Sequence, residues 1–93
     1  MHTVELLESA LHLAVRLGYR IRQESLGGLA GGGCEIRGQK ILFLDLALGP
    51  EDQLDQVVDT LRREPAAAGL PMPHKLRELL RLRQSAQWSA KPG

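Results

Sequence analysis

Aromatic residues are nearly missing from this sequence, which has one Phe, one Tyr and one Trp among 93 residues. A core must therefore be built from aliphatic side chains, which the 43% apolar content supplies. An excess of one charge is lacking too, because twelve basic and eleven acidic residues give a net charge of +1. This balance provides no whole-protein field that would attract nucleic acid or an anionic membrane.

Cysteine and long apolar runs are equally scarce. The single cysteine, Cys34, excludes an internal disulfide and predicts a reducing, cytoplasmic setting. No apolar run approaches the roughly 20 residues needed to cross a bilayer. The start MHTVELLESA lacks the basic region of a signal peptide. The sequence therefore predicts one small domain over residues 1–83 and a flexible tail over residues 84–93.

The clearest structural signal lies in residues 39–64. Ile41–Leu46 is an apolar run interrupted only by Asp45, which predicts a strand inside a sheet with both faces covered. Pro50 and the two acidic residues after it mark a helix N-terminus. This helix should end near Arg63, because Glu64 precedes a proline. Its apolar stripe consists of Leu54, Val57, Val58 and Leu61.

Upstream of this stretch the sequence predicts a helix and a strand. Thr3–Leu17 carries a wide apolar arc and ends at Gly18, a typical left-handed C-terminal cap. So wide an arc indicates either burial between the sheet and another helix or a face shared with a partner chain, as in a homodimer through this helix. Tyr19–Glu24 alternates in polarity, as expected for a half-exposed strand with Tyr19 and Ile21 facing inward.

Five glycines in residues 25–33, SLGGLAGGG, predict an irregular loop. Its spacing disfavours a phosphate site, because no G-x-G-x-x-G or P-loop motif is present and a strand follows. Cys34–Arg37 and the Ile41 strand should then be joined by a hairpin turn at Gly38-Gln39. The predicted fold is α+β: helix, three-stranded antiparallel meander, amphipathic helix and short C-terminal helix, with the first and Pro50 helices covering one face of the sheet.

The last predicted helix, His74–Arg83, is locally basic. Its basic residues, with one later lysine, outnumber the single Glu78: Lys75, Arg77, Arg81, Arg83 and Lys91. Such a patch is typical of a solvated helix face. It also leaves a nucleic-acid accessory protein as an alternative function.

The order of elements and several short motifs resemble the ImmA/IrrE-type zinc metallopeptidases. The resemblance covers residues 13–63 and includes Leu17-Gly18 at a helix end, Leu26-Gly27-Gly28 in the loop and Pro50-Glu51-Asp52 after the apolar strand. In that family the next helix carries H-E-x-x-H, which binds zinc and activates water. Here the motif is absent, because the matching positions hold Asp59, Thr60, Leu61, Arg62 and Arg63.

Asp59 and Arg63 are instead spaced for an ion pair, since positions i and i+4 share a helix face. The permanent charge of Arg63 would also repel Zn²⁺. The resemblance therefore implies an inactive relative, a non-catalytic binding or regulatory module for a protein or peptide, with no cofactor, metal or membrane partner. Its groove is predicted where the outward face of the Pro50 helix meets the glycine loop. The candidate residues are Asp55, Asp59, Arg63, Gly31 and Gly32.

An enzyme is the alternative from another class. Cys34 would be its nucleophile if a histidine came near in the fold, although a lone strand cysteine is usually a small buried hydrophobe. A tertiary cluster of aspartate with His2, His12 or His74 is the other enzymatic option, but the spacing of these histidines gives no zinc motif. Asp45, near the end of an apolar strand, is expected to accept backbone N–H groups from the following turn.

Overall fold

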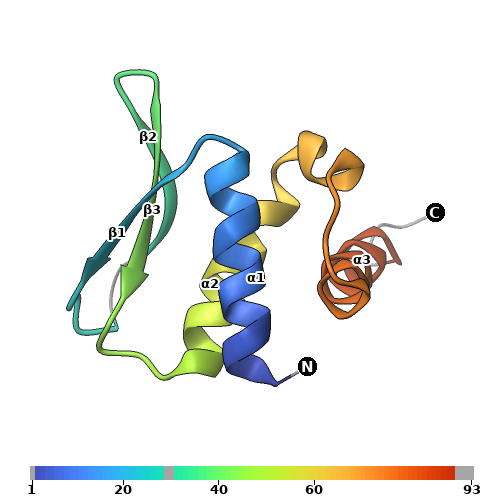
Figure 1. The fold of residues 1–93 in the computed structure, drawn as a ribbon, viewed down its shortest axis with the longest axis horizontal. Helices are drawn as coiled ribbons and strands as arrows, with labels where there is room; N and C mark the ends of the chain where they lie inside the picture. The colour runs from blue at the N-terminus through green and yellow to red at the C-terminus, as the bar shows by residue number, and fades with distance from the viewer. Residues whose placement is uncertain (1, 29–30, 90–93) are drawn as a thin grey trace.

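Three helices and three strands form a layered domain. The computed structural model describes residues 2–28 and 31–89, with side chains described up to residue 81. α1 (Thr3–Arg16) is followed by β1 (Arg20–Glu24), β2 (Gly32–Ile36) and β3 (Gln39–Asp45). Next come α2 (Pro50–Arg62), the 3-10 helix η1 (Pro65–Gly69) and α3 (His74–Ser89). Figure 1 shows the sheet, then α1 and α2 side by side, then η1 and α3. The predicted α+β class is confirmed.

The sheet is mixed rather than antiparallel. Its strand order is β1-β3-β2, with β1 parallel to β3 and β2 antiparallel to it. The predicted meander is therefore wrong for β1, which pairs with β3. The reason lies in the connections: Asp45 at the end of β3 binds Leu26 and Gly28 of the segment after β1, and β2 begins at the far edge, whereas the tight turn at Arg37 and Gly38 keeps β2 beside β3. The prediction that the Ile41 strand lies inside the sheet is confirmed.

Two turns depend on a left-handed backbone. Gly18 has a φ of 99° and follows α1, where the N–H of Tyr19 donates to the carbonyl of Ala14 at 3.0 Å. This is the C-terminal cap that the sequence predicts. Arg37 and Gly38 both have positive φ, 52° and 80°. They form the hairpin turn, one residue earlier than predicted, in the backbone geometry whose twist suits a two-residue connection.

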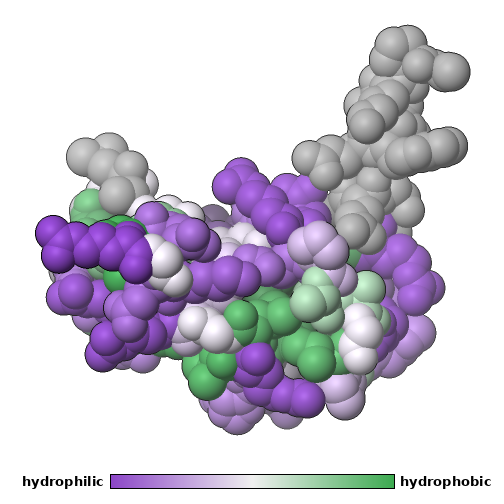
Figure 2. All heavy atoms as spheres, turned by 90° about the horizontal axis from the view of Figure 1, so that it is seen from above, coloured by the Kyte–Doolittle hydropathy of each residue, from purple (hydrophilic) through white to green (hydrophobic). Residues whose placement is uncertain are grey.

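α1 and α2 cover one face of the sheet, as predicted. Leu42 and Leu44 of β3 are buried beneath them, and the predicted stripe of α2 is buried with them. α1 contributes Leu7, Ala10, Leu13 and Ala14. Figure 2 views the molecule from above, onto the end where α1 stops beside η1. Apolar side chains gather in the middle of this surface. Leu17 and Leu70 pack against the core from these two segments.

The other sheet face carries no helix or strand within the described residues (Figure 1). The prediction that both faces of the Ile41 strand are covered holds in part: no helix or strand of the described residues lies over this face, but Ile41 is buried at 9% exposure and Phe43 is half-buried. Ile41 and Phe43 project to this side, because side chains alternate along a strand and Leu42 and Leu44 face the helices.

Two boundaries also differ from the prediction. β2 begins at Gly32, inside the segment expected to be irregular, and α3 continues past Arg83 to Ser89. No glycine or proline interrupts residues 84–89, so the helix meets no strong breaker there. Residues 90–93 of the predicted tail lie outside the described residues. None of the helices in the described ranges combines the length and the apolar character needed to cross a membrane.

Candidate functional site

The predicted groove between α2 and the glycine segment is occupied by a tight contact. A Cβ atom built on Gly31 would lie 2.5 Å from the Gln56 side chain, and one built on Gly33 would lie 2.5 Å from Cγ2 of Thr60. A side chain at Gly33 would collide with the buried Thr60, and one at Gly31 would displace the amide end of Gln56. The glycines therefore let the helix approach the backbone of β2 closely.

Thr60 joins the helix to the strand by hydrogen bonds. Its Oγ1 accepts the backbone N–H of Gly33 at 2.9 Å and donates to the carbonyl of Gln56 at 3.1 Å. The side chain is buried. In the family that the sequence resembles, the matching position holds the glutamate of H-E-x-x-H; here it closes the outer edge of β2.

The other predicted groove residues lie on α2 and directly after it. Asp55 and Arg63 are exposed, and Asp59 pairs with Arg62 at 2.8 Å, whereas Arg63 was the predicted partner. The side chains of α2 nearest to a Cβ built on Gly31 or Gly32 are Gln56 and Thr60. The structure thus brings the glycines and α2 together, and a groove shared by the five candidate residues remains a prediction.

Asp45 holds the loop that crosses the end of β3. Its carboxylate accepts the N–H of Leu26 at 2.9 Å, of Gly28 at 2.7 Å and of Ala47 at 2.9 Å. Burial alone would raise the pKa of this fully buried carboxyl, but the three N–H donors outweigh it and hold the pKa below the usual value. The predicted bond to the following turn is confirmed by Ala47, and the two bonds to the glycine-rich loop are additional.

A second polar cluster joins the starts of β1 and β3 to the segment after α2. The hydroxyl of Tyr19 donates to Glu64 at 2.7 Å, and Lys40 pairs with the same carboxylate at 3.1 Å. Burial, followed by the bond to Glu64, raises the pKa of Tyr19 to about 12. The bond from Tyr19, helped by Lys40, holds the pKa of Glu64 below its usual value despite partial burial. Each of the three side chains has a partner, so this cluster, the Tyr19 clamp, stabilises the fold.

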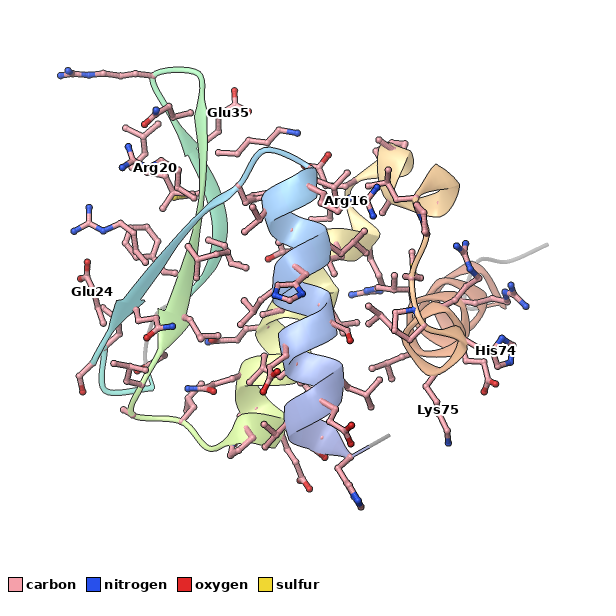
Figure 3. All side chains as sticks on the ribbon, viewed as in Figure 1. Arg16, Arg20, Glu24, Glu35, His74 and Lys75 are labelled. Carbon is pink, nitrogen blue, oxygen red and sulfur yellow. The ribbon has the colours of Figure 1, made fainter. Side chains whose placement is uncertain are left out.

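The uncovered sheet face carries features that the sequence analysis did not select. This outer sheet face consists of Arg20, Arg22, Cys34, Ile36, Ile41 and Phe43. The guanidinium of Arg22 lies 5.9 Å from the ring centroid of Phe43 and pairs with Glu24 at 2.9 Å. Figure 3 shows Arg20 and Glu24 projecting away from the helices. The alternation of the strands predicts that these residues share a face, but it does not predict that the face is uncovered.

Cys34 is exposed on the outer sheet face, not buried as a strand cysteine usually is. It is paired in register with Ile41 and neighbours no histidine on β1 or β3. The three histidines lie elsewhere: His2 caps α1, His12 is exposed, and His74 contacts Glu78 at 2.7 Å. In the described part of the chain, no three His, Cys, Asp or Glu side chains gather as a metal site would require.

A basic cavity of about 180 Å³ lies between α2, η1 and α3, lined in part by Arg62, Arg77 and Arg81. Arg77 donates to the carbonyls of Ala68 at 3.0 Å and Leu70 at 2.8 Å, so this arginine fastens η1 to α3. Figure 3 shows Lys75 and His74 at the outer side of α3. Arg83 and Lys91, counted in the predicted basic patch, lie outside the described side chains.

Comparisons of the chain with protein-family models, with curated proteins and with solved structures found no match. The resemblance to the metallopeptidases therefore stays a prediction from the sequence, and the residues themselves must support any function.

Proposed function

We propose that this chain is a non-catalytic binding module whose partner is a protein or peptide that docks on the outer sheet face. The observation that carries the proposal is the uncovered layer itself. Ile36 is 50% exposed there and Phe43 is half-buried beneath Arg22, whereas Ile41 of the same face is buried. An apolar centre bordered by arginines is typical of the surfaces that bind other proteins.

The charges on this face favour an acidic partner. Arg22 shares its charge with Glu24, but Arg20 has no carboxylate partner within the described ranges. A nucleic acid would be expected to use exposed aromatic rings for stacking. Phe43, the one aromatic side chain on this face among the described residues, is partly covered by Arg22.

The non-catalytic part of the proposal is supported by the contacts of the residues that stand at the H-E-x-x-H positions. Thr60 bonds β2, Leu61 lies in the core with 1% exposure, and Asp59 pairs with Arg62. Residues engaged in this way are positioned for packing rather than for activating water. The inactive metallopeptidase relationship, the cytoplasmic setting and the homodimer through α1 remain predictions.

Selection of displayed peptides against the purified chain tests this proposal. We expect peptides rich in acidic and apolar residues to be enriched and to lose binding to an Arg20→Glu/Arg22→Glu variant. The matched control is Lys75→Glu/Arg81→Glu on α3. It changes the net charge by the same amount at a place away from the sheet, and it should bind normally. Loss of binding in the control alone, or tighter binding of single-stranded DNA or RNA than of any peptide, would contradict the proposal.

A further inference from the structure

Among the described residues, one edge of the sheet is open for backbone pairing. β1 is the outer strand beside β3, and the carbonyl of Glu24 accepts the N–H of Leu46 at 2.9 Å. Since consecutive residues of a strand direct their backbone groups to opposite edges, Arg20, Arg22 and Glu24 bond β3 while Ile21 and Gln23 face outward. The N–H and C=O groups of these two residues form a short template for another strand.

The sheet is also narrow for the helices above it. Two packed helices have a total width of roughly 16–20 Å, because each takes up roughly the 8–10 Å that separates their axes. Three strands at about 4.8 Å each have a total width of only roughly 14 Å. α2 lies over β2 and β3, and α1 lies over β1 (Figure 1). The width that remains under α1, beyond β1, suits about one more strand.

Exposed apolar side chains on α1 mark that space. Val4 and Val15 are 51% and 54% exposed, and with Leu11 they follow helical spacing along one flank. The opposite flank faces η1 and α3, because Ser9, His12 and Leu13 line a cavity there with Met72. The valine flank lies on the other side of α1, where Leu11 packs against the same core as Ile21 of β1 and Val4 borders the start of α2.

We infer that an extended peptide adds to the free edge of β1 as a fourth strand, with apolar residues under the valine flank of α1 and acidic residues beside Arg20 and Arg22. The inference deepens the proposed function and depends on its premise that the partner is a protein or peptide. Strand pairing supplies main-chain hydrogen bonds, and the alternation of side chains supplies selectivity. A partner segment that alternates apolar and acidic residues would satisfy both faces at once.

A second copy of the chain fits this edge less well than a single strand. Because α1 extends over the width beyond β1, pairing β1 with its symmetry mate would place both α1 helices over the same two strands, closer than the roughly 8–10 Å at which helix axes pack, and their exposed valines would occupy the same space. An extended segment without its own helix meets no such conflict. The single strand is therefore the occupant that the geometry favours.

The probe is a capped, fluorescein-labelled peptide, Val-Glu-Val-Glu-Val-Glu-Val, followed by fluorescence anisotropy. Gln23→Pro removes an N–H that faces the open edge and spares the bonds to β3, so we expect about tenfold weaker binding, as for the loss of one or two hydrogen bonds. Gln23→Thr keeps the N–H and should bind like the original chain. Amide exchange at Ile21 and Gln23 should slow when the peptide binds.

A second measurement keeps the test independent of the fold of the proline variant. The same peptide, N-methylated on the amides that would face β1, should lose binding, whereas methylation of the alternate amides should not. A Val-Lys peptide should bind at least tenfold more weakly than the Val-Glu peptide. Equal binding of both methylated peptides, or of Gln23→Pro and Gln23→Thr, would overturn strand addition.

The outcomes separate this inference from the proposed function. If Arg20→Glu/Arg22→Glu abolishes peptide binding while Gln23→Pro leaves it intact, docking on the outer sheet face stands and strand addition is wrong. If neither variant changes the binding of any selected peptide, both proposals are wrong. Light scattering that shows a dimer, with the Ile21 and Gln23 amides protected before peptide is added, would make a second copy the occupant and overturn the inference.

Discussion

The two edges of the sheet are treated in opposite ways. At β2, Gly33 gives its outward N–H to Thr60, and α2 lies so close that no side chain fits. At β1, the outward groups of Ile21 and Gln23 meet no helix of the described residues, and α1 above β1 carries two exposed valines. A chain that covers one strand edge with a helix and leaves the other bare has a direction in which the sheet can grow.

The segment that connects these edges should be the most sensitive to change. Asp45→Ala would leave the N–H groups of Leu26, Gly28 and Ala47 without their buried acceptor. We expect thermal unfolding to shift down by more than about 10 °C, given the few degrees per kcal/mol typical of a domain of this size. Asp45→Asn keeps one acceptor oxygen, so its melting temperature should lie between those of the original chain and of Asp45→Ala. An unchanged melting temperature for Asp45→Ala would show that the loop is held by other contacts.

The closed edge comes next in expected effect. Gly33→Ala places a methyl group 2.5 Å from Cγ2 of Thr60, so the helix or the strand must shift. Overpacking of this kind costs about 1–3 kcal/mol in the free energy of unfolding, measured by urea denaturation. Thr60→Ser removes the colliding methyl group and keeps the hydroxyl. The double variant should therefore regain most of the loss, and strictly additive effects would argue against the close contact.

The Tyr19 clamp predicts a change with alkaline pH. The folded pKa of about 12 lies above the unfolded value of 10.0, so the unfolded state loses the proton first. The contribution of this group is therefore complete below pH 10 and is lost as pH rises through about 12. Because the chain has a single tyrosine, its ultraviolet absorbance reports the titration directly.

We expect the tyrosinate midpoint to move from near 12 in the folded chain to near 10 in concentrated urea. Tyr19→Phe should cost about 1 kcal/mol, the usual net value of one hydrogen bond, and should remove this part of the alkaline instability. A midpoint near 10 in the folded chain would mean that Glu64 does not hold the hydroxyl.

The open edge should tolerate change best. Gln23→Pro removes only an outward N–H, so the free energy of unfolding should change by less than about 0.5–1 kcal/mol. Arg22→Pro, one residue away, removes an N–H that bonds β3 and should cost about 3 kcal/mol or more. Equal costs for the two variants would mean that the direction assigned to the backbone of β1 is wrong.

Local patterns predicted most elements of this fold. Proline and acidic residues placed the start of α2, Gly18 placed the end of α1, and the apolar run around Leu42 placed the central strand. The pairing of β1 was missed because strand order depends on where a flexible connection leads, which the periodicity of each strand does not record. The sequence did not predict that Gly32 and Gly33 lie in β2. Gly33 is needed there because Thr60, a residue far along the chain, approaches the strand closely.

The candidate site residues came from a different kind of inference. Asp55, Asp59 and Arg63 were selected by analogy with a helix that carries a metal, whereas the outer sheet face was found from the exposure of its side chains. Cys34 and Arg20 share an exposed face because no helix or strand of the described residues lies over β3 on that side. A missing layer leaves no mark in the sequence of the strands it would have covered.

The mixed sheet also sets an order of assembly. The turn at Arg37 and Gly38 brings Ile36 opposite Gln39 at once, but Arg20 meets Ile41 only after a long loop has closed. We expect the hairpin and α2 to form early and β1 to dock late during folding. Until β1 arrives, the central strand has a bare side, so slow docking would be the step at which this small protein is most exposed to aggregation.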